Sequence, residues 1–172
     1  LEPSTRLSFS PGALYAAKGL EALAPILNRV HVLFINHQEL NEMTGQDIIT
    51  GARTCIEQGC SIVIVTLGEG KKLKTRRDDE TATVAYIRNA KREYIIQPPA
   101  GTETPPEDTT GAGDAFAAGF LYGLFQKKQP DECGYLGDTM ARFSLSRLGT
   151  RQGFPTLKQL ARRYRELYGR EL

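Results

Sequence analysis

The stretch that most constrains this chain lies at residues 107–119, where an acidic, hydroxyl-rich turn leads through two glycines into small and apolar residues typical of a helix. Gly111 and Gly113 have no Cβ, so the backbone there can turn sharply and approach a ligand closely. The first amides of the following helix lack partners within it, and the helix dipole places partial positive charge on them. The stretch therefore predicts an anion site, most often one for phosphate, formed by Gly111, Ala112 and Gly113.

Asp114 falls in the first turn of the same helix, beside the position of such an anion. A carboxylate there can accept a proton from an attacking hydroxyl while the backbone amides hold the group that is transferred. The simpler interpretation is an acidic residue that complements the helix dipole after an ordinary tight turn. The Gly-x-Gly-Asp pattern by itself does not decide between these two interpretations.

Two other phosphate-binding motifs are absent from the sequence. No Gly-x-x-x-x-Gly-Lys-Ser/Thr occurs, which excludes a P-loop nucleotide hydrolase. A dinucleotide-binding fingerprint would need glycine or alanine where Phe116 stands, and a strand where Pro105 and Pro106 stand.

The full string at residues 108–114, Asp-Thr-Thr-Gly-Ala-Gly-Asp, resembles the C-terminal signature of the ribokinase/PfkB family of ATP-dependent sugar and nucleoside kinases. The resemblance implies that Asp114 is the general base and that residues 111–113 form the anion hole. It also implies that Asp108 and Thr110 bind a monovalent cation such as K⁺, as they do in some relatives.

The composition indicates one soluble globular domain. Of 172 residues, 40% are hydrophobic and 24% are charged, and the net charge of +2 is too balanced to predict a nucleic-acid or membrane partner. The longest apolar run, residues 61–67, is too short to cross a bilayer. Three cysteines without a Cys-x-x-Cys spacing favour reduced thiols, and hence a cytoplasmic protein. The basic run at residues 71–77 is followed by acidic residues, which favours a solvated hairpin.

The pattern of apolar residues predicts an α/β fold with a mainly parallel central sheet flanked by helices. A strand, a helix over residues 13–28 and a second strand come first, and a β-branched segment at residues 61–68 is typical of a central parallel strand. Asp47 is expected to cap a helix, and Gly119 and Gly123 predict close packing of another helix against a backbone. The first two strands are expected at residues 6–10 and 31–35. Two further strands, at residues 83–88 and 94–97, are expected to form an antiparallel hairpin, and further helices are expected at residues 48–58, 115–125, 131–147 and after 156.

A second match to the same family lies where the strand at residues 31–35 ends. Asn36 and Glu39 form an Asn-x-x-Glu motif followed by leucine and a Thr-Gly helix end, which the family associates with Mg²⁺ and the phosphates. Magnesium keeps several waters and takes few carboxylates, so a sparse motif suffices chemically. Taken alone, Glu39 is equally consistent with an ordinary first-turn charge.

Two further segments resemble the nucleotide-contacting parts of the family. Thr66 and Gly68 form its Thr-x-Gly element, although the family usually has a glycine where this chain has Lys71. Near the end of the chain, Asp138 stands close to a position where relatives often carry an asparagine beside the adenine. The resemblance thus implies ATP as the phosphoryl donor.

The resemblance covers nearly the whole chain, but the family's N-terminal half and small β lid have no counterpart before Leu1. We therefore expect residues 1–172 to be the C-terminal, nucleotide-binding part of one ribokinase-like kinase domain, inactive towards sugars when alone. The expected function is ATP-dependent phosphorylation of a hydroxymethyl group on a sugar or related small molecule, with a nucleoside as the alternative acceptor. The longer protein is expected to form a homodimer. The competing hypothesis is a non-catalytic nucleotide-binding or structural remnant of a kinase.

Overall fold

The computed structural model describes residues 2, 4–68, 71–74, 80–99, 111–145 and 154–172. The chain forms two compact units, Leu1–Ile95 and Ile96–Leu172. Asp108 and Thr110, the residues predicted to bind a monovalent cation, lie outside the described residues. The other predicted site residues are all described.

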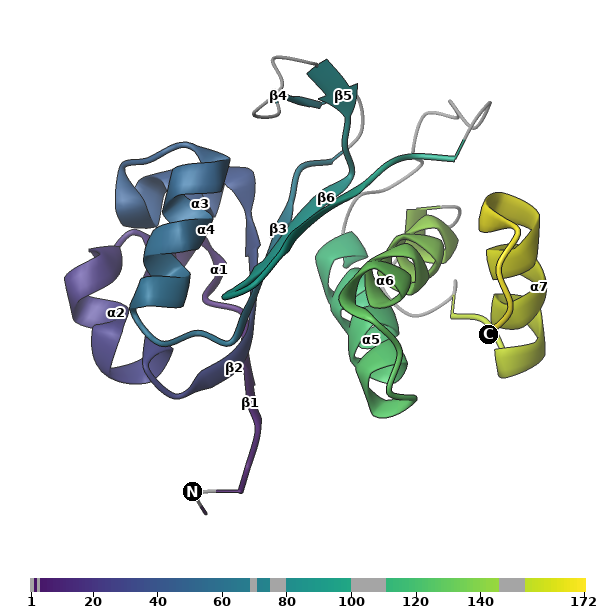
Figure 1. Ribbon diagram of the computed structural model, residues 1–172, viewed down its shortest axis with the longest axis horizontal. Helices are drawn as coiled ribbons and strands as arrows, with labels where there is room; N and C mark the ends of the chain where they lie inside the picture. Colours follow the sequence, from purple (N-terminus) through teal and green to yellow (C-terminus); the bar gives the residue numbers. More distant parts are fainter. Residues whose placement is uncertain (1, 3, 69–70, 75–79, 100–110, 146–153) are drawn as a thin grey trace. The chain divides into compact units, whose positions relative to one another are not determined.

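The first unit is built on a five-stranded mixed sheet in the order β1-β2-β3-β6-β7 (Figure 1). β1, β2 and β3 run parallel, as the alternation of strands and helices predicts. The next strand, β6, is antiparallel to β3, so the expectation of parallel pairing around β3 holds on one side only. No helix intervenes between β3 and β6 in the described chain, and an antiparallel neighbour needs no helical crossover. The strands are β1 Leu7–Phe9, β2 Val30–Asn36, β3 Ile62–Thr66, β6 Ala85–Asn89 and β7 Glu93–Ile96.

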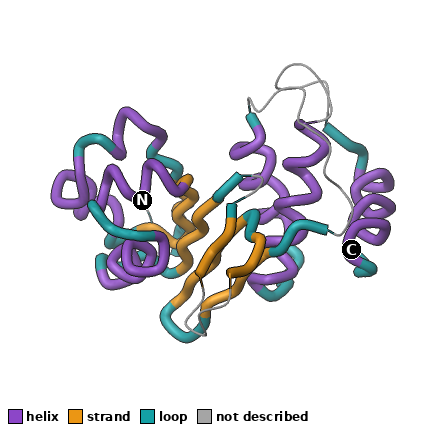
Figure 2. The backbone as a smooth tube through the Cα atoms, turned by 90° about the horizontal axis from the view of Figure 1, so that it is seen from above, coloured by secondary structure: helices purple, strands orange, loops and turns teal. Residues whose placement is uncertain are grey.

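Four helices cover one face of this sheet, and both views show them together (Figure 1, Figure 2). Their apolar side chains and those of the sheet form one buried cluster that includes Leu27, Leu40 and Val63. The helices are α1 Gly12–Ala16, α2 Gly19–Leu27, α3 His37–Thr44 and α4 Ile48–Glu57. This arrangement confirms an α/β fold with helices packed on the sheet.

The prediction of one continuous helix over residues 13–28 is wrong, because the helix is interrupted between α1 and α2. Gly19 has φ of +81°, a left-handed conformation that a continuing helix does not contain. Leu14 is 78% exposed, so the apolar stripe expected along a single helix does not extend back to it.

The predicted cap of α4 is confirmed, since Asp47 accepts hydrogen bonds from the amides of Ile49 and Thr50.

The basic run forms part of a small two-stranded sheet, β4 Lys72–Lys74 and β5 Glu80–Ala82. The two strands pair antiparallel, as the hairpin interpretation predicts. Lys72 and Glu80 form an exposed ion pair at 3.9 Å, and between the lysines Leu73 is buried in the cluster of the first unit.

The second unit contains α5 Ala112–Phe125, α6 Pro130–Leu145 and α7 Leu157–Tyr168. α5 and α6 pack with their backbones almost in contact. A Cβ placed on Gly119 would lie 2.6 Å from the carbonyl oxygen of Leu136, and one on Gly123 would lie 3.0 Å from Cα of Cys133. At Gly137 of α6, the ring of Phe116 from α5 occupies the space that a side chain would need. The prediction that the helix glycines serve close packing is confirmed.

Replacing Gly119 with alanine is expected to lower the free energy of unfolding by about 1–3 kcal/mol, because the new methyl group would overlap a backbone oxygen that cannot move alone. Chemical denaturation followed by circular dichroism measures the change. Gly113→Ala is the matched control, since an added Cβ there meets no atom within 4 Å. Its stability should be unchanged or higher by up to about 1 kcal/mol. Equal stability of Gly119→Ala and the unsubstituted chain would contradict the packing argument.

The three cysteines are free, as the sequence predicts, and the structure shows that they are buried. Burial raises the pKa of Cys55, Cys60 and Cys133 to about 12, so all three are neutral thiols at physiological pH. Within the described part of the chain, no helix has the length and apolar character needed to span a membrane.

Candidate active site

The N-terminus of α5 has the geometry expected of an anion site. Gly111 is its N-cap residue and adopts a left-handed conformation (φ 81°, ψ −1°), for which glycine carries no steric cost. The first hydrogen bond of the helix runs from the amide of Ala115 to the carbonyl of Gly111 at 2.9 Å. The amides of Ala112, Gly113 and Asp114 precede that bond and have no partner within the helix. A glycine cap also supplies no side chain to satisfy them.

Asp114 is the third residue of α5 and is exposed to solvent. Its carboxylate therefore stands at the positive end of the helix dipole, next to the amides that have no partner within the helix. This position suits both interpretations of the sequence, because it stabilises the helix and leaves the carboxylate free to accept a proton. The described residues do not separate the two roles.

The Asn-x-x-Glu motif forms a capping box at the start of α3. The amide of Glu39 donates to Oδ1 of Asn36 at 2.8 Å, and the amide of Asn36 donates to Oε2 of Glu39 at 3.1 Å. This local role accounts for the spacing of the two residues without any ligand. A carboxylate has two oxygens and about four lone-pair positions, so the capping box leaves Glu39 able to bind a cation or its water.

The sheet brings a predicted nucleotide residue beside this capping box. Thr66 ends β3 and lies opposite Asn36, the last residue of β2. Both residues are at the carboxyl ends of adjacent parallel strands, which is where ligands bind in open α/β sheets. Gly68 follows with φ of +77°, and an added Cβ there would meet no atom within 4 Å. Gly68 is therefore required for its backbone conformation rather than for space.

His37 directly follows Asn36 as the first residue of α3. Burial of the ring lowers the pKa of His37, the charge of Lys71 lowers it further, and a backbone hydrogen bond with Thr66 acts in the opposite direction. The imidazole is therefore neutral at physiological pH.

Asp138 is engaged in a buried network within the second unit. It is 5% exposed, and its Oδ2 accepts hydrogen bonds from Nε of Arg142 at 2.6 Å and from the hydroxyl of Tyr168. Burial by itself would lower the pKa of Arg142, but the carboxylate of Asp138 reverses the shift and the pKa is raised. Burial and the same carboxylate raise the pKa of Tyr168 well above its ordinary range. The network joins α6 to α7.

Sequence reasoning did not find this network. The i,i+4 spacing of Asp138 and Arg142 is a signal for an ion pair on a helix. Tyr168 is thirty residues from Asp138 and has no comparable signal. Its ring also packs on Tyr135, with centroids 4.6 Å apart, so α7 is held to α6 by aromatic contact as well as by charge.

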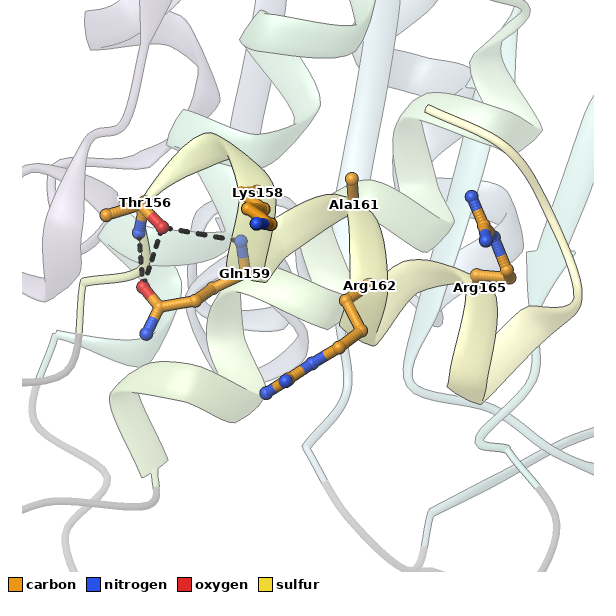
Figure 3. Close-up of a pocket in the computed structure, with 6 residues that line it drawn as sticks. All are labelled: Thr156, Lys158, Gln159, Ala161, Arg162 and Arg165. Atoms are coloured by element: carbon orange, nitrogen blue, oxygen red, sulfur yellow. Dashed lines mark hydrogen bonds between the residues drawn. The ribbon is translucent and has the colours of Figure 1, made fainter.

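A hollow of about 590 Å³ lies along α7, on a helix that carries none of the predicted site residues (Figure 3). Two of its three basic side chains form ion pairs, since Arg162 pairs with Glu166 at 3.6 Å and Arg165 pairs with Glu171 at 2.8 Å. Both are exposed ion pairs on the solvated face of α7. The residues that line the hollow are Thr156, Lys158, Gln159, Ala161, Arg162 and Arg165.

The predicted residues thus fall into two groups, one in each unit. Asn36, Glu39 and Thr66 meet at one edge of the sheet, with Gly68 two residues beyond Thr66. The N-terminus of α5 and the buried Asp138 belong to the other unit. Among the described residues, no group of three or more His, Cys, Asp or Glu side chains could hold a metal ion. A cation at Glu39 would therefore need ligands from water or from a bound phosphate.

Comparison with solved structures shows the class of fold to which this chain belongs. The nucleoside kinase of Methanocaldococcus jannaschii, described as an archaeal member of the ribokinase family, is similar over 94% of this chain, with a TM-score of 0.72 and 25% identity. The fold is therefore ribokinase-like, as the sequence predicts. The matched region is 48% of that kinase.

Sequence comparisons place the chain more narrowly. The model of the pfkB family carbohydrate kinases matches residues 12–157, so the chain belongs to this family. An uncharacterized sugar kinase of Archaeoglobus fulgidus is 38% identical over 90% of the chain, and a cytidine kinase of Thermococcus kodakarensis is 33% identical over 77% of it. The matched regions are 56% and 43% of those two proteins, so the chain spans about half the length of these relatives.

Proposed function

We propose that this chain supplies the ATP-binding and proton-accepting part of a kinase that phosphorylates a hydroxymethyl group of a small molecule. The observation that carries the proposal is the start of α5, where amides without a partner in the helix follow a left-handed Gly111 and Asp114 stands in the first turn. Membership of the pfkB family adds independent support. The family also makes ATP and Mg²⁺ the expected donor and metal.

In the proposed reaction the hydroxyl oxygen of the acceptor bonds to the terminal phosphorus of ATP, and the bond from that phosphorus to the bridging oxygen of ADP breaks. The carboxylate of Asp114 accepts the hydroxyl proton. The amides of residues 112–114 stabilise negative charge on the transferring phosphoryl group. No covalent intermediate with the protein is needed.

The residues of the first unit have supporting roles in this proposal. Glu39 and Asn36 would hold Mg²⁺ largely through water, and the ion would neutralise charge on the phosphates when bound. Thr66 and Gly68 would contact the nucleotide from the end of β3. Asp108 and Thr110 remain proposed ligands of a monovalent cation such as K⁺.

Asp138 enters the proposal as a residue that flanks the nucleotide. Because its carboxylate is bonded to Arg142 and Tyr168, we infer that it acts by holding α6 and α7 in place rather than by direct contact with the base.

The acceptor is proposed to be a sugar, with a nucleoside as the alternative. Similar proteins carry both descriptions, since one is a sugar kinase and others are a cytidine kinase and nucleoside kinases. A cytoplasmic location and a homodimer of the whole protein are further parts of the proposal. The second candidate function is nucleotide binding without catalysis, which the local stabilising roles of Glu39 and Asp114 would permit.

A crystal structure of the protein with ATP or an unreactive analogue tests the assignment of the anion site. The terminal phosphate is expected within hydrogen-bonding distance of the amides of residues 112–114, because their dipoles and the helix dipole converge there. Sulfate in a crystal without nucleotide should occupy the same place. A phosphate bound elsewhere, with these amides paired internally, would remove the anion-hole assignment.

A further inference from the structure

We propose that Lys71 binds the phosphate chain of the nucleotide. The inference rests on the proposed function, and it assigns a charged contact that the phosphate-binding motifs of the sequence do not contain. The observations behind it are the hydrogen-bonding pattern at the end of β3 and the surroundings of the lysine.

The hydrogen bonds beyond β3 place Lys71 at the nucleotide edge of the sheet. The ladder between β3 and β6 continues past Thr66, with the amide of Leu67 donating to the carbonyl of Val84 at 2.9 Å. The next bond runs from the amide of Thr83 to the carbonyl of Lys71 at 3.0 Å. Since Thr83 and Val84 are adjacent, the backbone of Lys71 returns to the ladder beside Leu67. The backbone of Lys71 therefore lies next to Leu67 and just beyond the end of β3 at Thr66, although Lys71 comes several residues later in the sequence.

The backbone of Lys71 is held by its hydrogen bond with Thr83 and by the start of β4 directly after it, while the residue itself is exposed. Leu73, two residues on, is 6% exposed and anchors β4 in the apolar cluster of the first unit. Lys71 itself is exposed. In the part of the chain that the structure describes, no carboxylate forms an ion pair with its ammonium group, whereas the neighbouring Lys72 is paired with Glu80. A fixed backbone with an exposed cation suits binding of an anionic ligand.

Lys71 lies at the same edge as the residues proposed to contact the nucleotide and Mg²⁺, because its backbone joins the ladder next to Leu67, one residue after Thr66, and Thr66 lies opposite Asn36. Lysine binds phosphate well as a compact cation with three donors. A glycine, which is usual at this position in the family that the sequence resembles, cannot make such a contact.

Equilibrium binding of ATP, ADP and adenosine to the chain tests the inference, with isothermal titration calorimetry as the measurement. Lys71→Ala is expected to weaken binding of ATP roughly three- to tenfold, because an exposed ion pair to a multiply charged ligand is lost. Binding of adenosine, measured directly or by competition with ATP, should be unchanged because adenosine has no phosphate. Lys71→Arg should retain most of the affinity for ATP. Lys72→Ala is the matched control, and it should bind all three ligands like the unsubstituted chain.

The outcomes separate this inference from the proposed function. If the unsubstituted chain binds ATP and Lys71→Ala binds it equally well, the role of Lys71 is refuted and the proposed function stands. An equal loss of ATP and adenosine binding would also refute it, because the lysine would then support the fold of the hairpin. Circular dichroism of the variant identifies that case. If the unsubstituted chain binds no ATP, both proposals fail.

Discussion

Asp114→Asn is expected to lower the turnover of the protein that contains this chain by about 10²–10⁴-fold, the usual contribution of a general base. Asparagine has nearly the same shape as aspartate but cannot accept the proton of the acceptor hydroxyl. The amides of residues 112–114 remain in place at the start of α5, so the dissociation constant for ATP should change little. Steady-state rates with ATP and a phosphoacceptor, together with calorimetric binding of ATP, measure the two effects separately.

Asp131→Asn is the matched control for this experiment. Asp131 is also an acidic residue in the first turn of a helix of the second unit, and it pairs with Arg170 at 3.4 Å. It has no proposed part in proton transfer, so its loss should leave the turnover number unchanged. Near-normal turnover of Asp114→Asn would exclude Asp114 from the mechanism and leave only its role at the start of the helix.

Asp138→Ala is expected to lower the free energy of unfolding by about 3–5 kcal/mol. The substitution removes the buried carboxylate that both Arg142 and Tyr168 contact. The side chain of Arg142 is 12% exposed, so removing Asp138 takes an opposite charge away from a largely buried cation. Chemical denaturation of the chain, followed by circular dichroism, measures the loss.

Two other variants show whether burial is the cause of that loss. Glu166→Ala removes the partner of Arg162 and Arg163 on the exposed face of α7 and should cost no more than about 1 kcal/mol. Tyr168→Phe removes one hydrogen bond to Asp138 while keeping the ring, and should cost about 1 kcal/mol. If Asp138→Ala were as mild as Glu166→Ala, the buried network would not be what holds α7.

The parts of the fold that the sequence predicts well are those decided by local chemistry. Asp47 caps its helix with its own side chain. Gly119 indicates close packing, because a glycine inside a helix destabilises it unless a neighbouring element needs the space. The start of α5 follows from Gly111 and the residues immediately after it. The cap at Asp47 and the start of α5 are decided within one or two turns of chain, whereas the contact of Gly119 with α6 is signalled by the residue type alone.

The parts that could not be predicted depend on residues far apart or on a single backbone angle. The interruption before α2 depends on the left-handed conformation of Gly19, which cannot be predicted from the pattern of apolar residues. The antiparallel neighbour of β3 depends on the connection through β4 and β5. The partnership of Asp138 with Tyr168 arises only when α7 packs on α6. The catalytic and ligand-binding roles themselves remain predictions.

The glycine contact between α5 and α6 has a mechanical consequence. Most helix pairs are separated by a layer of side chains that can change rotamer and absorb a small sliding motion. Here Gly119, Gly123 and Gly137 remove that layer, so the two backbones bear directly on each other or on a single ring. We therefore expect an axial displacement of the start of α5 to move α6 with it, and the hydrogen bond that Tyr168 donates to Asp138 to couple α7 to the pair. The amides proposed to bind phosphate would then shift only together with all three helices.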